Sequence, residues 1–157
     1  MASPELPRRI FASAVGPLLA ELNGEGALAK LGRARIELAG RPVAHPTFDQ
    51  LAGELDAYFR GEPVRFSVPT APAGSPFQQR VWAELARLEW GRMVSYSELA
   101  ERVGSNPRAV GQANGANPVA IVIPCHRVVG KDGSLVGYAG GLDMKRALLR
   151  LERCLLF

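Results

Sequence analysis

The 157-residue sequence is poor in cysteine and histidine, with two of each. Two cysteines cannot form the dense disulfide framework of a small secreted domain. One Cys-His pair is itself a candidate catalytic site, so too few ligands remain for a closed structural zinc site, and we expect no metal. No stretch is long and apolar enough for a membrane span, and no signal segment is evident at the start. These features predict a soluble, cytoplasmic protein without a membrane partner.

Composition favours a globular chain with an anionic partner. Hydrophobic residues make up 47% of the sequence, which is enough for a core in one compact unit or two small subdomains. The formal net charge is +4 at pH 7. A basic balance attracts anions, although charge alone does not single out nucleic acid.

Residues 1–69 are expected to form an N-terminal α/β subdomain. Three short apolar stretches separated by glycine and asparagine predict strands of an antiparallel meander, at 10–13, 17–22 and 27–31. Asn23-Gly24 is a strong hairpin signal. Apolar side chains recur with helical spacing over residues 47–60, which predicts an amphipathic helix ending at Gly61. We expect His45, just before it, on the surface.

A Pro/Gly/Ala/Ser segment at 70–75 predicts a linker, so residues 76–157 should form a second, mostly helical unit. Ser75 and Pro76 are a favoured N-cap and first-turn pair, and they predict a helix whose apolar face includes Trp82.

The next two helices form a helix-turn-helix candidate. Ser95 and Glu98 match a capping box for a helix that ends near Val103. A tight turn follows, and Pro107 can open a second short helix. Two readings of this second helix stay open, because small residues allow close approach to a DNA groove wall but also pack tightly inside a core. These small residues are Ala109, Gly111, Ala113 and Gly115, with Arg108 as the one long cation before them.

The apolar run 119–123 leads directly into Pro124-Cys125-His126. The run predicts a buried strand, and because proline cannot donate to a ladder, Cys125 should lie at the strand end. Thiols attack as thiolates, and only about 3% of an unperturbed thiol is ionised at pH 7, so an adjacent imidazole matters. Taken alone, the pair is equally consistent with a buried structural cysteine beside a surface histidine.

The remaining chain contains a glycine-rich loop at 136–141, which can bring backbone close to a ligand. Asp143 is expected to cap the last helix, in which Leu148, Leu149 and Leu151 pack inward. By its pattern alone, Glu152 would be a solvated surface charge. Cys154 lies among leucines, which should raise its pKa and keep it inert, whereas Cys125 should be available as a thiolate near neutral pH.

Together, Ile-Pro-Cys-His-Arg-Val at 123–128, the small-residue helix and Tyr-x-Gly-Gly at 138–141 resemble the O6-alkylguanine-DNA alkyltransferases, the methylated-DNA–protein-cysteine methyltransferases. The resemblance is close and in order over residues 75–157 and loose before them. It implies an α/β (α+β) fold with an RNase H-like N-terminal subdomain and a C-terminal winged helix-turn-helix domain that carries the cysteine.

The function that the resemblance implies is direct-reversal DNA repair. A monomer without a cofactor would bind double-stranded DNA containing O6-alkylguanine and transfer the alkyl group once, irreversibly, to Cys125; O4-alkylthymine is a further candidate substrate. In the implied relay, His126 draws the thiol proton through a water and Glu152 orients His126. Tyr96 would rotate a DNA phosphate and protonate the departing guanine.

The resemblance also implies a set of DNA-binding and base-binding residues. Arg108 would fill the gap left by the flipped base, and Asn117 would brace the turn before the cysteine. The carbonyls of Cys125 and Val128 would accept from the exocyclic amine, and the Ala139 N–H would donate to the lesion oxygen. The set is completed by Ser95, Ala109 and Gly111.

Three departures from the family pattern concern substrate range. The turn before Arg108 is shorter than in animal members, Asn114 replaces a methionine, and Ala139 replaces a common serine. Three other functions compete: a lesion sensor, which would lack the acceptor cysteine, a winged-helix regulator that only binds DNA, and a cysteine hydrolase that turns over. The presence of Cys125 argues against the first, and no route to regenerate the thiol is evident for the last.

Overall fold

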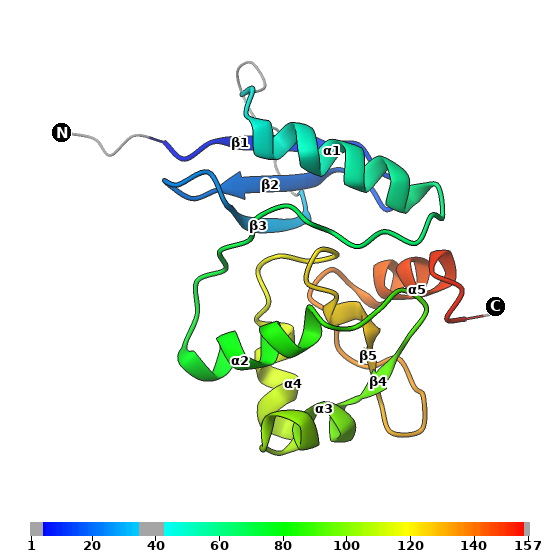
Figure 1. Ribbon diagram of the computed structural model, residues 1–157. Coiled ribbons are helices and arrows are strands. Elements are labelled where there is room, and N and C mark those ends of the chain that lie inside the picture. Colours follow the sequence, from blue (N-terminus) through cyan, green and yellow to red (C-terminus); the bar gives the residue numbers. More distant parts are fainter. Residues whose placement is uncertain (1–4, 35–42, 156–157) are drawn as a thin grey trace.

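The computed structural model describes residues 5–34 and 43–155. Residues 1–4 and 35–42 of the predicted N-terminal unit and residues 156–157 of the predicted C-terminal unit lie outside the described residues. Strands β1 (Arg8–Phe11), β2 (Leu18–Leu22) and β3 (Leu28–Arg33) form an antiparallel sheet in that order, which confirms the predicted meander (Figure 1). Alternate β2 side chains are buried, as a sheet with one covered face requires.

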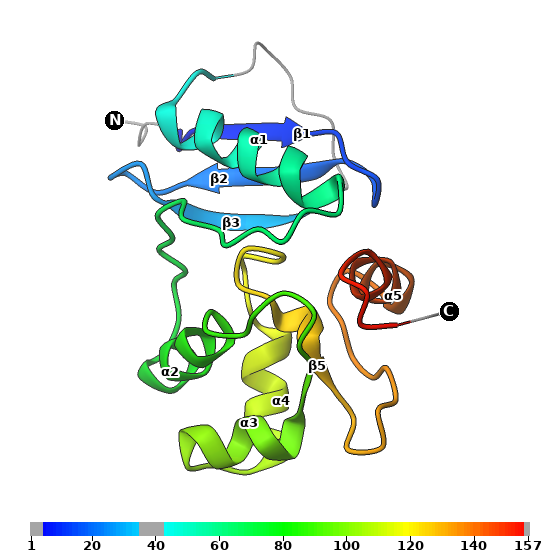
Figure 2. The ribbon, with the colours of Figure 1, turned by 45° about the vertical axis from the view of Figure 1, so that its right-hand side comes forward.

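Helix α1 (Pro46–Phe59) covers the sheet and confirms the predicted amphipathic helix (Figure 2). Its buried side chains include Phe48, Leu51, Leu55 and Tyr58. His45 is partly exposed, and it is the N-cap of α1, a role that the sequence pattern did not predict. Its Nδ1 accepts a hydrogen bond from the Thr47 amide at 3.0 Å.

Helices α2 (Pro76–Leu85), α3 (Tyr96–Val103) and α4 (Pro107–Gly115) confirm the predicted helical C-terminal half. Ser75 caps α2 through a complete capping box. At α3 the Ser95 hydroxyl accepts from the Glu98 amide at 3.1 Å, whereas the Glu98 carboxylate lies 3.4 Å from the Ser95 hydroxyl instead of reaching back to the backbone. The left-handed Gly104 (φ 70°) ends α3 and starts the turn of the helix-turn-helix.

The segment 119–123 is the main error of the sequence-based prediction, because it forms a turn instead of a strand. Only Val119 pairs, in an isolated bridge to Leu31, and Ile121 has a positive φ of 71°. The Asn117 side chain holds this turn: it donates to the Ile123 carbonyl at 2.8 Å and accepts from the Val119 amide at 3.0 Å. The side chains of Val119, Ile121 and Ile123 stay buried without a ladder.

As a result, the predicted strand-end position of Cys125 is also wrong. Cys125 begins a short 3₁₀ helix (Cys125–Arg127), and strand β5 (Val128–Val129) follows it, parallel to β4 (Val94–Ser95). Helix α5 (Leu142–Leu151) then begins after Gly141. The predicted Asp143 cap does not form, because that carboxylate binds Arg33 at 3.3 Å.

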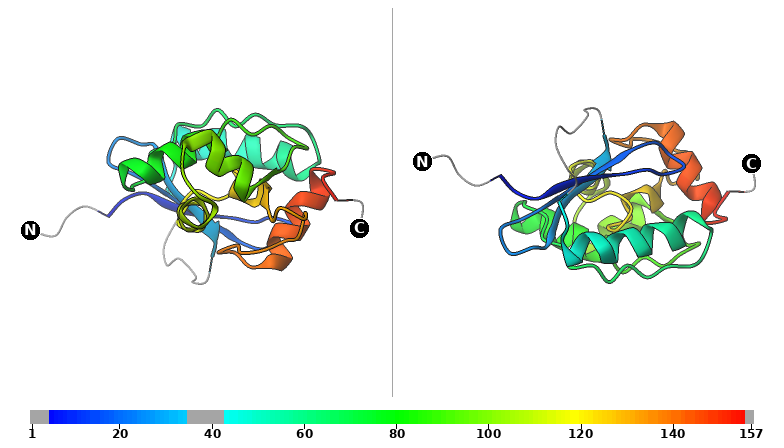
Figure 3. Two further views of the ribbon diagram at one scale, coloured as in Figure 1. Left: turned by 90° about the horizontal axis from the view of Figure 1, so that it is seen from below. Right: turned by 90° about the horizontal axis from the view of Figure 1, so that it is seen from above.

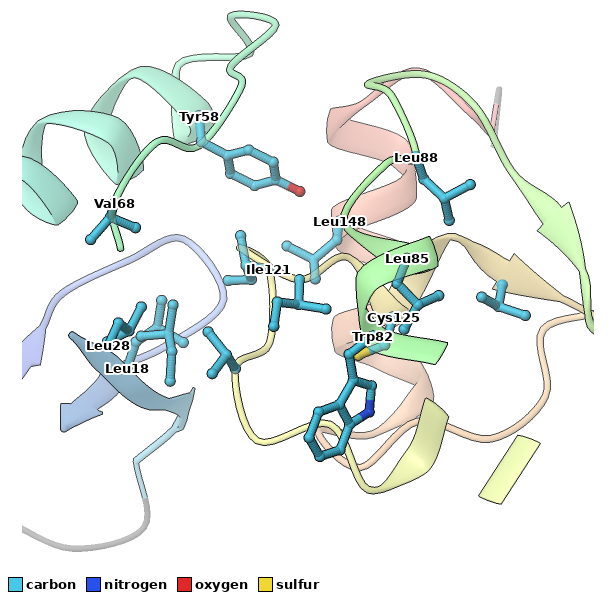
Figure 4. Close-up of a cluster of buried hydrophobic side chains, with 14 of the residues drawn as sticks. Leu18, Leu28, Tyr58, Val68, Trp82, Leu85, Leu88, Ile121, Cys125 and Leu148 are labelled. Carbon is cyan, nitrogen blue, oxygen red and sulfur yellow. The ribbon is translucent and has the colours of Figure 1, made fainter. Parts of the chain in front are cut away.

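The two halves of the chain share one cluster of buried apolar side chains, which runs from Leu18 and Leu28 in the sheet to Trp82, Leu85 and Leu148 (Figure 4). The views from below and above show the C-terminal ends of α1 and α5 near each other (Figure 3). The division at 70–75 into two domains therefore stays a prediction. Within the described ranges, no helix is long and apolar enough to cross a membrane.

Candidate active site

Cys125 lines a cavity of about 400 Å³ between the sheet and the C-terminal half. The walls come from β3, the end of α4, the turn before the cysteine and the glycine-rich loop. Three predicted site residues, Cys125, Asn117 and Ala139, share this cavity. Other lining residues are Arg33, Asn114, Tyr138, Gly140 and Met144.

Polar atoms with unmet hydrogen-bonding capacity surround this site. Within the described part of the chain, three buried side-chain atoms have no hydrogen-bond partner: Asn114 Oδ1, His126 Nδ1 and the Tyr138 hydroxyl. Asn114 and Tyr138 line the cavity with Cys125. Buried polar groups are normally paired, so their concentration here fits a polar ligand.

Glu152 is buried at the end of α5, which contradicts the surface position suggested by its pattern alone. Its Oε2 accepts from His126 Nε2 at 2.5 Å and from the Tyr58 hydroxyl at 2.6 Å, and its Oε1 accepts from Arg127 Nε at 2.6 Å. Burial alone would raise the pKa of Glu152, but the hydrogen bonds from His126 and Arg127 outweigh burial and lower it to about 2. Glu152 is therefore a carboxylate.

His126 is fully buried and held in one orientation by Glu152. An ionised carboxylate only accepts, so Nε2 carries a proton and Nδ1 presents its lone pair. Burial lowers the pKa of His126, although Glu152 opposes the shift. The result is a neutral imidazole with a free base position on Nδ1.

Cys125 is also buried, and burial raises the pKa of its thiol. A hydrogen bond with Asn117 and the positive charge of Lys145 act in the opposite direction without reversing the shift. The expected thiolate near neutral pH is therefore wrong for the ligand-free protein, and proton removal must accompany attack. The pKa of Cys154 is raised to about 11, mainly by burial, in the direction that its apolar surroundings predicted.

Lys145 is a buried cation on α5 that the sequence reasoning missed. Its Nζ donates to the carbonyls of Val128, Val136 and Gly137 at 2.6, 3.0 and 3.3 Å. Burial lowers the pKa of Lys145 to about 8. The only sequence signal was the position of Lys145 on the apolar face of the last helix.

Two backbone acceptors implied by the resemblance are already engaged. The Val128 carbonyl accepts from Lys145, and one of its lone pairs remains. The Cys125 carbonyl accepts from the Val128 amide and, at 3.3 Å, from the Asn114 side chain. A ligand amine could donate to the Cys125 carbonyl only if the Asn114 amide moves aside.

Two neighbouring helices, α3 and α4, carry Tyr96 and the predicted DNA-binding residues Ser95, Arg108, Ala109 and Gly111, with Ser95 as the N-cap of α3. Tyr96 begins α3, is half-buried and donates to the Val136 carbonyl at 3.1 Å. Gly111 of α4 lies against it, since a Cβ there would be 3.7 Å from the Tyr96 ring. Arg108 is exposed in the first turn of α4, with Ala109 beside it and Ser95 buried as the α3 cap. The structure thus brings Tyr96 and Gly111 together and leaves Arg108 pointing outward.

Arg33 of β3 joins the sheet to the glycine-rich loop. Its guanidinium donates to the Gly140 carbonyl at 3.1 Å and binds Asp143 at 3.3 Å. Sequence reasoning missed both Arg33 and Tyr58, because each acts across a long separation in the chain. Tyr58 gave one signal: a tyrosine on the buried face of a helix needs a partner for its hydroxyl.

Comparisons with known proteins agree with this geometry. A family model described as "6-O-methylguanine DNA methyltransferase, DNA binding domain" matches residues 76–154. The methylated-DNA–protein-cysteine methyltransferase of Methanosarcina acetivorans is 44% identical over 150 residues, covering 91% of this chain and 96% of that protein. The Mycobacterium leprae protein of the same name is 49% identical over 108 residues, covering 68% and 66%. The crystal structure of Mycobacterium tuberculosis OGT in complex with DNA superposes with a TM-score of 0.83 at 40% identity, covering 94% and 93%.

Proposed function

The chain belongs to the methylated-DNA–protein-cysteine methyltransferase family, and from this we propose that Cys125 accepts alkyl groups from O6-alkylguanine in double-stranded DNA. The protein repairs DNA by transferring an alkyl group to one of its own cysteines. Two observations support Cys125 as that cysteine: it lines the cavity, and its chain neighbour His126 is hydrogen-bonded to Glu152. Cys154 does not line this cavity.

In the proposed step, Cys125 Sγ attacks the saturated alkyl carbon. A C–S bond forms as the C–O bond breaks, and the electron pair leaves with the guanine. The thiol proton passes through a water to His126 Nδ1, while Glu152 stabilises the imidazolium. Tyr96 gives a proton to the departing base. Atoms and charge balance without a cofactor, and the thioether product ends the reaction after one turnover.

Base recognition is proposed to combine shape with a few polar contacts. The lesion carbon lies within the base stack, so the nucleotide must be extruded at a cost of a few kcal/mol. Arg108, exposed on α4, would occupy the gap, and the small residues beside it let the helix enter the minor groove. The Ala139 amide would donate to the lesion oxygen, and the remaining lone pair of Val128 would accept from the exocyclic amine.

Mass spectrometry tests the acceptor. Excess duplex containing O6-methylguanine should add one methyl mass per chain, on the peptide with Cys125. Cys125→Ser should add none, and the matched control Cys154→Ser should react like the unaltered protein. A duplex with O4-methylthymine tests the second lesion. Label on Cys154, or more than one lesion repaired per chain, would contradict the proposal.

We further propose that the protein works as a monomer in the cytoplasm. Sedimentation with and without a lesion duplex should give the mass of one chain, then one chain per short duplex. Cell fractionation should recover it with soluble cytoplasmic proteins. A stable dimer in the absence of DNA would contradict the first expectation.

A further inference from the structure

We propose that Tyr58 is a positioning residue: its hydroxyl fixes the orientation and charge distribution of Glu152, and through Glu152 it sets how readily His126 accepts a proton. The N-terminal half of the chain would thereby complete the catalytic relay. This inference rests on the proposed function of His126 and Glu152.

The geometry holds the Tyr58 hydroxyl at a fixed point. Tyr58 lies in the last turn of α1, is fully buried and donates to Glu152 Oε2 at 2.6 Å. Its ring packs edge-on against Phe59 and Trp90, with centroids 5.1 and 5.4 Å away, and tilted against Phe66 at 5.7 Å. Figure 4 shows the hydroxyl pointing from α1 toward α5. The aromatic packing therefore aims one donor at one carboxylate oxygen.

That oxygen is the one His126 uses. Arg127 occupies Oε1, whereas Tyr58 and His126 share Oε2. A second donor on Oε2 withdraws electron density from it and weakens its pull on an imidazolium. Without the hydroxyl, Glu152 should stabilise the protonated form of His126 more strongly. The orientation of the Glu152 carboxylate, and with it that of the imidazole, should also be less fixed.

Other charges around the pair leave this direction unchanged. Arg127 and Lys145 both lower the pKa of His126, and neither contacts the Tyr58 hydroxyl. Removing the hydroxyl takes away a donor while those charges stay in place. The pKa of His126 should therefore rise in Tyr58→Phe, and a smaller fraction of His126 would be available as a base at a given pH.

The test is a double-mutant cycle on transfer rate. Single-turnover transfer from free O6-benzylguanine, which removes DNA binding from the measurement, is followed from acidic to alkaline pH. Tyr58→Phe should slow transfer about tenfold, as expected for loss of one hydrogen bond to a charged group, and move the acidic limb to higher pH. In a Glu152→Gln background the same change should have little further effect, because its route to His126 is gone.

Thr47→Val is the matched control. Thr47 also lies on α1, is buried and donates its hydroxyl, in this case to the Gly26 carbonyl at 2.6 Å. This variant should be less stable than the unaltered protein but should transfer at the same rate with the same pH profile.

Each outcome decides a different point. An unchanged rate and pH profile in Tyr58→Phe, or an equal loss in the Glu152→Gln background, would overturn the positioning role. Absence of transfer to Cys125 in the unaltered protein would instead overturn the proposed function. If Tyr58→Phe does not fold, NMR of the unaltered protein gives a second test. A protected, downfield Tyr58 hydroxyl proton that shifts in Glu152→Gln supports the positioning role, and the absence of such a proton overturns it.

Discussion

Burial and hydrogen bonding together decide which active-site residues carry charge. Glu152 stays ionised because three protein donors replace water around it, and His126 stays neutral because burial outweighs the attraction of Glu152. Cys125 is held as a thiol for the same reason. A neutral imidazole beside a neutral thiol can take the proton as the alkyl carbon is attacked, so neither member of this pair needs to carry a buried charge before the substrate arrives.

The charge on Glu152 predicts a stability that depends on pH. Its pKa is about 2 in the folded protein against a usual 4.5, so its contribution is complete above about pH 4.5 and is lost as the pH falls toward 2. This shift corresponds to about 3 kcal/mol. Glu152→Gln lacks it, so the gap in unfolding free energy between the two proteins should be largest near neutral pH. Urea unfolding at several pH values measures the gap, and a gap that does not narrow in acid would contradict the expectation.

Single residues also show the limit of sequence reasoning. The charge pattern alone placed Glu152 on the surface, and only the family resemblance assigned it to His126. Its partner Tyr58 lies 94 positions away. Helical spacing correctly predicted that Tyr58 faces the core, but periodicity within one helix contains no information about a partner on another element.

At the scale of elements, local signals predicted the helices well and the cysteine segment poorly. Caps at Ser75 and Ser95 act within a few residues, so the sequence shows them directly. The run 119–123 has the composition of a strand, yet the Asn117 side chain supplies hydrogen bonds that a neighbouring strand would have supplied. A short apolar run reveals burial but does not reveal what satisfies its backbone.

Helix α4 yields a prediction about DNA. Arg108 is exposed in its first turn, where it would replace the extruded base. Arg108→Ala should slow transfer from a lesion duplex by roughly tenfold or more, because flipping loses its compensating contact, while transfer from free O6-benzylguanine should change little. Parallel single-turnover measurements on both substrates provide the comparison.

The control for that prediction removes the same charge elsewhere. Arg146 is exposed on α5, so Arg146→Ala lowers the net charge equally without altering α4. It should weaken duplex repair much less than Arg108→Ala. Equal losses for the two variants on duplex, or equal losses for Arg108→Ala on both substrates, would argue against insertion of Arg108 into the base stack.

At the scale of the whole molecule, the shared core predicts cooperative unfolding across the 70–75 segment. Leu18 is fully buried in the sheet, whereas both tryptophans, Trp82 and Trp90, lie in the other half of the chain. Leu18→Ala should cost about 2–5 kcal/mol and should shift the tryptophan fluorescence and circular dichroism transitions together. Two separated transitions would instead indicate that the halves are independent domains.

The net charge of +4 predicts that the affinity for both undamaged and damaged DNA depends on salt concentration. The exposed residues of α4 are Pro107, Arg108, Gln112 and Gly115, with Arg108 as the one cation and Gln112 as the one side chain able to contact base edges, so affinity should come mainly from phosphates and depend little on sequence. If about four phosphates are neutralised, a fourfold rise in salt should weaken duplex binding by about a hundredfold. Transfer from free O6-benzylguanine involves no phosphate and should hardly change over the same range, which makes it the internal control. Fluorescence titrations of several undamaged duplexes at several salt concentrations measure the affinity. An affinity that does not change with salt, or a strong preference for one sequence, would contradict the prediction.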